Sequence, residues 1–171
     1  MVRFLVMAVA AMAAPSQADV LSATSGGFAV EAKATVPVPP TEAYAALGRI
    51  GRWWNSGHTY SGDAANMRLE LRVDGCFCEA IPDGAGEIEH GRVIYVRPGQ
   101  TLRVQGGLGP LQSEGVLGTL TWQLRAVEGG TEITQTYVVG GYMRGGFEAA
   151  APLVDQVMTA QLEGLRRHLA R

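Results

Sequence analysis

Two thiols and an imidazole carry the most reactive chemistry in this 171-residue sequence: Cys76, Cys78 and His90. Asp74-Gly75 is a two-residue hairpin signal that would place both thiols on the apolar face of the next strand. A looser turn at 82–86 would then set His90 opposite Cys78. These ligands suit zinc or copper(I), and a thiol beside a base suits nucleophilic catalysis. No fourth ligand stands out and buried cysteines commonly fill a core, so no metal is expected and these three residues are kept only as candidate ligands.

The spacing of the two cysteines argues against a disulfide. Residues two apart on a regular strand have Cα atoms roughly 6.5–7 Å apart, at the edge of disulfide geometry. We therefore expect Cys76 and Cys78 to be reduced or only transiently oxidised. On this register Glu79 falls on the opposite face and is predicted to be a surface acid near Arg68 and Arg72.

An aromatic stretch follows the first third of the chain and holds Trp53, Trp54, His58 and Tyr60. Its rings could stack on a ligand at the mouth of a pocket, with His58 exchanging a proton near neutral pH. The alternative is that the two tryptophans plug one end of the core. Both interpretations stay open.

Gln135 and Tyr137 alternate with other residues on a strand whose remaining inward positions are apolar. A buried amide needs a hydrogen-bond partner or a ligand, and the tyrosine hydroxyl has the same need. His58, His90 and Tyr137 are therefore the candidate acids and bases. The sequence contains no Gly-x-Ser-x-Gly, phosphate-loop or His-Glu-x-x-His motif, which favours a non-catalytic protein without a cofactor.

These residues must be positioned by a sheet and one long helix. The stretch 147–171 repeats apolar residues at spacings of three and four, which predicts a helix with one apolar face that begins near Ala150 or Ala151. Gly164 interrupts it, and a mid-helix glycine costs about 1 kcal/mol relative to alanine. Either a neighbouring segment packs closely there, or the helix leaves room for a ligand.

Alternating apolar residues predict about seven strands before this helix, beginning with 28–36, and two short helices after that first strand. The hairpin-like connections imply an antiparallel sheet, which the long helix must cover on one face. The glycine-rich segment 106–118 is predicted to be a mobile, partly apolar loop. The expected class is therefore α+β, with a curved sheet around a C-terminal helix.

The N-terminal residues predict export. A basic start, an apolar run and small residues predict a signal peptide at 1–18 that is cut after Ala18. A flexible lead at 19–27 and one domain at 28–171 follow, in the periplasm or outside the cell. The apolar run is too short for stable membrane insertion. A formal net charge of −2 without a basic cluster argues against nucleic acid as a partner.

Four segments give the chain its resemblance to a known superfamily: Thr35–Pro40 followed by Tyr44, Trp53-Trp54, Gly91–Pro98 and Gly129–Thr134. The chain resembles the START-like (SRPBCC) superfamily over about residues 28–170, in the branch of the polyketide cyclases and heat-shock-ATPase-activator homology proteins. The resemblance implies a helix-grip fold with a tunnel for an apolar ligand under the C-terminal helix. Its members include carriers, cyclases and partner-binding modules.

The resulting hypothesis is a periplasmic protein that binds a small hydrophobic or amphipathic molecule between sheet and helix. A cyclase or dehydratase acting on such a ligand is the alternative, and a protein-interaction module without a cavity is the second. The expected cavity residues are Trp53, Trp54, His58, Tyr60, Leu71, Cys78, Trp122, Gln135, Tyr137, Met158 and Gly164.

Overall fold

The computed structural model describes residues 17–171, and most of the predicted signal peptide lies outside the described residues. It contains one sheet of eight antiparallel strands. The strands are β1 (Gln17–Thr24), β2 (Gly27–Val36), β3 (Met67–Leu69), β4 (Cys76–Ile81), β5 (Gly86–Arg97), β6 (Thr101–Gln105), β7 (Gly115–Val127) and β8 (Gly130–Tyr142).

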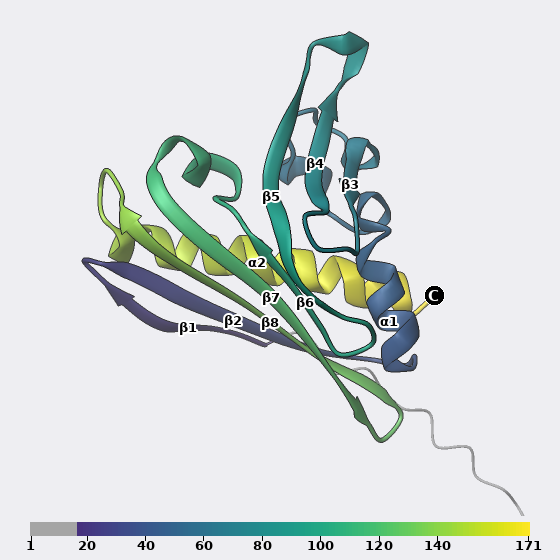
Figure 1. Ribbon diagram of the computed structural model, residues 1–171. Coiled ribbons are helices and arrows are strands. Elements are labelled where there is room, and N and C mark those ends of the chain that lie inside the picture. The colour runs from purple at the N-terminus through teal and green to yellow at the C-terminus, as the bar shows by residue number, and fades with distance from the viewer. Residues whose placement is uncertain (1–16) are drawn as a thin grey trace, which may run out of the picture.

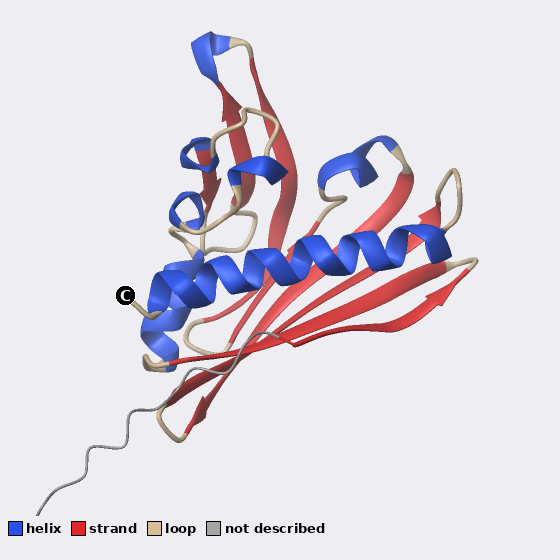
Figure 2. Ribbon diagram, turned by 180° about the vertical axis from the view of Figure 1, so that it is seen from behind, coloured by secondary structure: helices blue, strands red, loops and turns tan. Residues whose placement is uncertain are grey.

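Two α-helices accompany the sheet, α1 (Pro40–Leu47) and α2 (Phe147–Leu169). Five short 3-10 helices lie in the connections: η1 (Ile50–Arg52), η2 (Ser56–His58), η3 (Ala64–Asn66), η4 (Pro82–Gly84) and η5 (Gly109–Ser113). The strand order is β1-β2-β8-β7-β6-β5-β4-β3. The sheet curves around α2, which lies across one of its faces (Figures 1 and 2). The predicted α+β helix-grip fold is confirmed.

The centre of the sheet is the hairpin of β7 and β8, whose inward side chains alternate as the sequence predicts. Leu120 pairs with Tyr137 and Trp122 pairs with Gln135, and all four side chains are buried. Period-two burial of large side chains fixes the register of such strands, because a slip of one residue would expose them. This face of the sheet is the floor on which α2 lies.

Helix α2 buries the apolar face that its spacing predicts, including Met158, Leu162 and Leu165. It begins at Phe147, the first residue of the predicted stretch and one turn before Ala150, and the buried Phe147 ring lies 6.1 Å from the ring of Phe28. Pro152 therefore lies inside the helix rather than at its start. None of the helices within residues 17–171 is long and apolar enough to cross a membrane.

The predicted flexible lead at 19–27 is wrong, because residues 17–24 form β1 and pair with β2 along its length. This pairing uses backbone groups, which do not depend on side-chain type. Val20 and Leu21 are exposed, so the strand carries no alternating apolar pattern that could reveal it. The sheet therefore has eight strands rather than about seven.

The predicted register of β3 and β4 is also wrong. β3 ends at Leu69 rather than continuing to the Asp74-Gly75 turn, and Leu69 pairs with Phe77 while Arg68 pairs with Cys78. As a result, Phe77 packs inward and the two cysteines share the outer face with Arg68. A tight turn at Asp74-Gly75 would set Leu71 opposite Cys78, so the observed pairing is offset by three residues, and an odd offset reverses the side on which every side chain lies.

The segment 106–118 is more regular than the predicted mobile loop. It contains η5 and the start of β7, and Leu111 is buried. The hydroxyl of Tyr137 donates to the carbonyl of Gly106 at 2.9 Å and accepts from the N–H of Leu108 at 3.0 Å. A side chain of the central sheet thus anchors the start of this loop.

Candidate functional site

A cavity of about 570 Å³ lies between the N-terminal half of α2 and the segments that contain η2 and η5. Its walls are largely apolar. The lining residues are Trp54, Gly57, His58, Thr59, Tyr60, His90, Leu108, Gly109, Pro110, Leu111, Tyr137, Met143, Ala150, Leu153, Val154, Val157 and Met158.

Helix α2 supplies one wall through Ala150, Leu153, Val154, Val157 and Met158. Their spacing of three and four residues puts them on one side of the helix. Met158 is buried, whereas the side chain of Leu153 is 64% exposed. This wall therefore runs from the protein interior to a rim that meets solvent.

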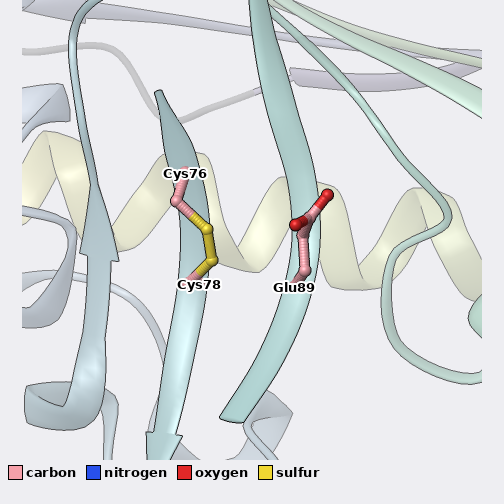
Figure 3. A group of neighbouring side chains, drawn as sticks. All are labelled: Cys76, Cys78 and Glu89. Atoms are coloured by element: carbon pink, nitrogen blue, oxygen red, sulfur yellow. A yellow bond between two sulfur atoms is a disulfide. The ribbon is translucent and has the colours of Figure 1, made fainter. Parts of the chain in front are cut away.

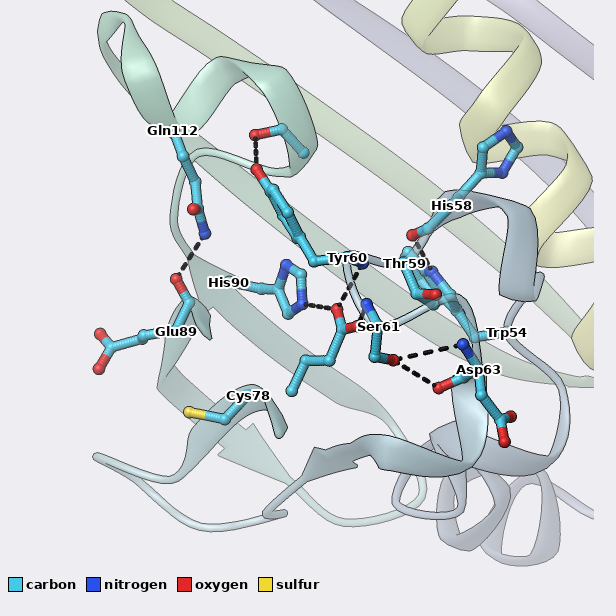
Figure 4. A network of polar contacts seen from close by, with 12 residues as sticks. Trp54, His58, Thr59, Tyr60, Ser61, Asp63, Cys78, Glu89, His90 and Gln112 are labelled. Carbon is cyan, nitrogen blue, oxygen red and sulfur yellow. Dashed lines mark hydrogen bonds and ion pairs between the residues drawn. The ribbon is translucent and has the colours of Figure 1, made fainter. Parts of the chain in front are cut away.

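The buried polar group of the site is a pair formed by His90 of β5 and Glu79 of β4, and in Figure 4 a dashed line runs from the labelled His90 to the carboxylate. His90 Nε2 lies 2.9 Å from Glu79 Oε2, and both side chains are almost fully buried. The Glu79 carboxylate also accepts the backbone N–H groups of Tyr60, at 3.1 Å, and of Ser61. Two chain segments thus converge on one carboxylate, which the sequence prediction had placed on the surface.

Burial and hydrogen bonds act in opposite directions on Glu79. Burial alone would raise the pKa of the carboxyl, but the bonds from Ser61, Tyr60 and His90 outweigh it and hold the pKa below its usual value. Burial lowers the pKa of His90, although Glu79 opposes that shift. At neutral pH the pair is therefore a carboxylate and a neutral imidazole.

This protonation state fixes the roles of the two ring nitrogens of His90. A carboxylate only accepts hydrogen bonds, so Nε2 carries the proton and donates it to Glu79. Nδ1 is then an acceptor, and it has no hydrogen-bond partner among residues 17–171. Because His90 lines the cavity, the site offers a basic nitrogen to whatever enters.

Aromatic rings hold the imidazole from two sides. The His90 ring lies 5.0 Å from that of Phe77 and 5.9 Å from that of Tyr60. Tyr60 is half exposed, and its hydroxyl donates to the carbonyl of Gly109 at 2.9 Å. Tyr60 thereby links the segment that follows η2 to η5, and Figure 4 shows the hydrogen bond made by its hydroxyl.

A second polar side chain, that of His58, lies at the rim of the cavity close to α2 (Figure 4). Its Nδ1 lies 2.7 Å from Nε2 of Gln161, whose Oε1 accepts the N–H of Asn55 at 2.8 Å. The amide nitrogen only donates, so Nδ1 of His58 is the acceptor. Gln161 is fully buried. Sequence reasoning missed it, although a polar residue on the apolar face of α2 was the available signal.

Five of the predicted cavity residues line the cavity: Trp54, His58, Tyr60, Tyr137 and Met158. Of the candidate acids and bases, Tyr137 has its hydroxyl engaged by the loop, and burial raises its pKa to about 12. It is therefore a poor proton carrier near neutral pH. Of the three candidates, His58 and His90 remain as cavity-lining residues that could contact a ligand with a ring nitrogen.

Six predicted cavity residues lie elsewhere: Trp53, Leu71, Cys78, Trp122, Gln135 and Gly164. A Cβ at Gly164 would collide with the carbonyl oxygen of Trp53, so close packing explains this glycine. The Nε1–H of Trp53 donates to Ala46 at 2.9 Å, and Leu71 lies beside Gly48. This half of the interface under α2 is filled by protein.

The amide of Gln135 finds its partners within the protein. Trp122 Nε1 donates to Gln135 Oε1 at 2.8 Å, and Gln135 Nε2 donates to the carbonyl of Met158 at 2.8 Å. These bonds tie β7, β8 and α2 together in the core. Gln135 is therefore a structural residue rather than a ligand contact.

Cys76 and Cys78 form a disulfide, contrary to the prediction of free thiols (Figure 3). Their Cα atoms lie 5.4 Å apart, closer than on a regular strand. The pairing of β4 with β5 shifts between Phe77 and Cys78, where His90 is the extra residue on β5. Because of the register, Cys78 pairs with Glu89 rather than with His90. The predicted cluster of two thiols and His90 is therefore not formed.

Comparison with known proteins agrees with this architecture. Residues 27–170 match the family described as polyketide cyclase / dehydrase and lipid transport. The chain belongs to this family. No curated protein matches its sequence. The family match over residues 27–170 confirms the resemblance inferred from the sequence.

Solved structures support the fold. A Rhodobacter sphaeroides protein is 21% identical, with a TM-score of 0.58 over 90% of this chain and 98% of its own. CalU16 from Micromonospora echinospora is 14% identical, with a TM-score of 0.56 over 90% and 81%. DynU16, from the dynemicin biosynthetic locus, is 18% identical, with a TM-score of 0.55 over 82% and 46%. At these identities the likeness concerns the fold.

Proposed function

We propose that this protein binds a small apolar or amphipathic molecule in the cavity beside α2. The observation that carries the proposal is the cavity itself, whose volume of about 570 Å³ and apolar walls are typical of small-molecule sites. The family's lipid-transport members support it. A protein-interaction module would not need such a cavity.

The two histidines suggest an amphipathic ligand. His90 offers Nδ1 from the interior, and His58 lies on the rim. A few polar groups in an apolar pocket usually orient the ligand. A ligand with an apolar body and a hydroxyl or enol group would satisfy His90 while filling the rest of the cavity.

Native mass spectrometry and titration with 1-anilinonaphthalene-8-sulfonate test the proposal. We expect saturable probe binding that Val157→Trp weakens at least 10-fold, because the indole would fill the cavity at a lining position. Gln156→Trp, at an exposed position on α2, is the matched control and should bind like the wild type. Absence of both a retained molecule and saturable probe binding would refute the proposal.

A second candidate function is acid–base catalysis on the bound molecule, of cyclase or dehydratase type. The observation that favours it is the Glu79–His90 pair, which presents a neutral imidazole nitrogen to the cavity. Such a base could remove a proton next to a ketone, with the Glu79 carboxylate stabilising the imidazolium that forms.

Turnover of a poly-β-ketone by the wild type, followed by absorbance and product mass, tests this second function. General-base catalysis contributes about 10²–10⁴ in rate, so His90→Gln should lose that factor while probe binding remains within a few-fold. His58→Gln is the comparison and should affect binding more than rate. Equal rates for wild type and His90→Gln would exclude His90 as the base.

We also propose that the protein acts outside the cytoplasm, on the strength of the predicted signal peptide at 1–18. Cutting after Ala18 would remove only Gln17 and Ala18 from β1, and the pairs from Asp19 onward would remain. The mass of the protein recovered from periplasm and medium tests this. An uncleaved chain confined to the cytoplasm would refute it.

A further inference from the structure

The outer face of β3, β4 and β5 carries a second cavity, of about 330 Å³, on the side of the sheet away from His90. Its lining is polar, unlike that of the ligand cavity. It contains the Cys76–Cys78 disulfide, three arginines and three glutamates, of which Glu89 lies nearest to the sulfur atoms. We call this cavity the outer cleft.

We propose that the outer cleft is a zinc site that opens when the Cys76–Cys78 disulfide is reduced. The ligands are the two thiolates and the Glu89 carboxylate, whose ligand atoms lie within 4.8 Å of one another. Figure 3 shows the cysteines on β4 facing Glu89 on the neighbouring strand β5. The proposal does not depend on the ligand cavity.

Backbone geometry places these three residues together. Cys78 and Glu89 are register partners, and Cys76 lies two residues from Cys78 on the same strand, so both cysteines point to the same side. The backbone carbonyl of Glu89 accepts Nε2 of Gln112 at 2.7 Å, which ties this part of β5 to the η5 segment. The ligands therefore come from two paired strands rather than from a free loop, as a preorganised site requires.

Charge around the cleft matches a divalent cation. Its three arginines form ion pairs with its three glutamates: Arg68 with Glu87, Arg72 with Glu70, and Arg92 with Glu89. With the disulfide closed these charges balance. Two thiolates add two negative charges, which Zn²⁺ would neutralise. When zinc binds, Arg92 would lose part of its ion pair with Glu89. This loss lowers the affinity for zinc, but the remaining contact keeps the carboxylate oriented.

The ligand set favours zinc over copper(I). Copper(I) prefers soft sulfur ligands alone, whereas zinc accepts thiolates and carboxylates together. Three protein ligands would leave a fourth position for water, as in zinc sites that exchange their metal or bind a further ligand.

The disulfide between Cys76 and Cys78 contributes little to the stability of the fold. Both cysteines lie on one strand, and a disulfide stabilises mainly by closing long loops of the unfolded chain. One residue separates them. A bond that ties no two elements together can open without unfolding the protein, which is what a reversible site requires.

Opening the site consumes a low-molecular-weight thiol. One thiolate attacks a sulfur of the disulfide and a second releases the mixed disulfide, so that two external thiols become one external disulfide and Cys76 and Cys78 become thiols. Zn²⁺ then displaces two thiol protons, one from each cysteine. The disulfide form has no thiolate and cannot bind the metal.

Zinc titration of the full-length protein by calorimetry, before and after reduction with a metal-inert phosphine, tests the proposal. Reduced protein should bind one equivalent, and oxidised protein none. Cys76→Ser and Cys78→Ser should each weaken binding at least 100-fold, and Glu89→Gln about 10-fold or more. Glu128→Gln, at an exposed position in the β7–β8 turn and outside the outer cleft, is the control and should bind like the reduced wild type.

Cobalt(II) provides a second readout, because thiolate-to-cobalt charge-transfer absorption reports the sulfur ligands directly. Circular dichroism of each variant checks that it is folded. Equal zinc binding by oxidised and reduced protein, absence of the charge-transfer band, or a Glu89→Gln variant that binds like the wild type would overturn the proposal.

Discussion

The two faces of β4 and β5 carry neighbouring residues in opposite surroundings. On the inner face, Phe77, Glu79 and His90 are buried and contact one another through rings and hydrogen bonds. On the outer face, the disulfide and Glu89 line a charged cleft. Cys76 and Cys78 flank Phe77 in sequence, and Glu89 precedes His90. The buried Glu79–His90 pair and the charged outer cleft therefore lie on opposite sides of the same two strands.

The difference lies in what each face contributes. The inner face combines stability with function, because its polar groups position His90 while its rings fill the core. The outer face carries reactive atoms whose bonds hold no two elements together. Changes on the inner face should therefore affect folding strongly, and changes on the outer face should affect it little.

The largest effect is expected for Phe77→Ala. Phe77 is fully buried, and its ring lies 5.5 Å from that of Trp54 and 5.0 Å from that of His90. Removing such a ring typically costs about 3–5 kcal/mol of unfolding free energy. Urea denaturation followed by tryptophan fluorescence measures it. Ile94→Ala, at an exposed position on β5, should change stability by less than about 1 kcal/mol.

The next effect is expected for Glu79→Ala. It leaves the N–H groups of Tyr60 and Ser61 and the Nε2–H of His90 without their acceptor. Unsatisfied buried donors cost about 1–3 kcal/mol each, and partial access to water in the new space reduces the sum to about 3 kcal/mol. Glu79→Gln retains one oxygen acceptor and should lose about half as much. Urea denaturation measures both losses, and an unfolding free energy of Glu79→Ala equal to that of the wild type would show that the hydrogen bonds of Glu79 do not stabilise the fold.

Much of the fold could be predicted because its signals are local. The spacing on α2 and the alternation along β7 and β8 depend on residues close in sequence. β1 could not be predicted, since it is held by backbone bonds to β2 while Val20 and Leu21 are exposed. An edge strand of this kind has no side-chain pattern to read.

The site was harder because it depends on register. Tyr60 and Tyr137, which the sequence analysis expects beside a cavity, line one in the structure, whereas the predicted register put the cysteines inside and Glu79 outside. The Asp74-Gly75 signal suggested a tight hairpin, whereas β3 ends at Leu69. The observed pairing is offset by three residues from that hairpin, and an odd offset exchanges the two faces. The bulge at His90 on β5, which sets Glu89 rather than His90 opposite Cys78, is likewise a feature of strand pairing rather than of composition.

A smaller effect should appear in the pH dependence of stability. Burial lowers the pKa of His90 in the folded protein, so the unfolded chain takes up this proton first as the pH falls below about 6.5. Stability should therefore decrease from that pH down to the lower pKa of the folded state. His90→Gln should flatten this decrease in urea denaturation series. His168, whose pKa is also lowered, contributes equally to both proteins and cancels in the difference.

The smallest effect is expected for opening the disulfide. Reduction, or the double variant Cys76→Ala with Cys78→Ala, should lower the unfolding free energy by about 1 kcal/mol and by no more than about 2 kcal/mol, because the closed loop is so short. Strand β4 keeps its backbone pairs with β3 and β5 in either state. Urea denaturation of oxidised and reduced protein measures the difference. A loss as large as that of Phe77→Ala would mean that the outer face shares the structural role of the inner one, and the division between the two faces would fail.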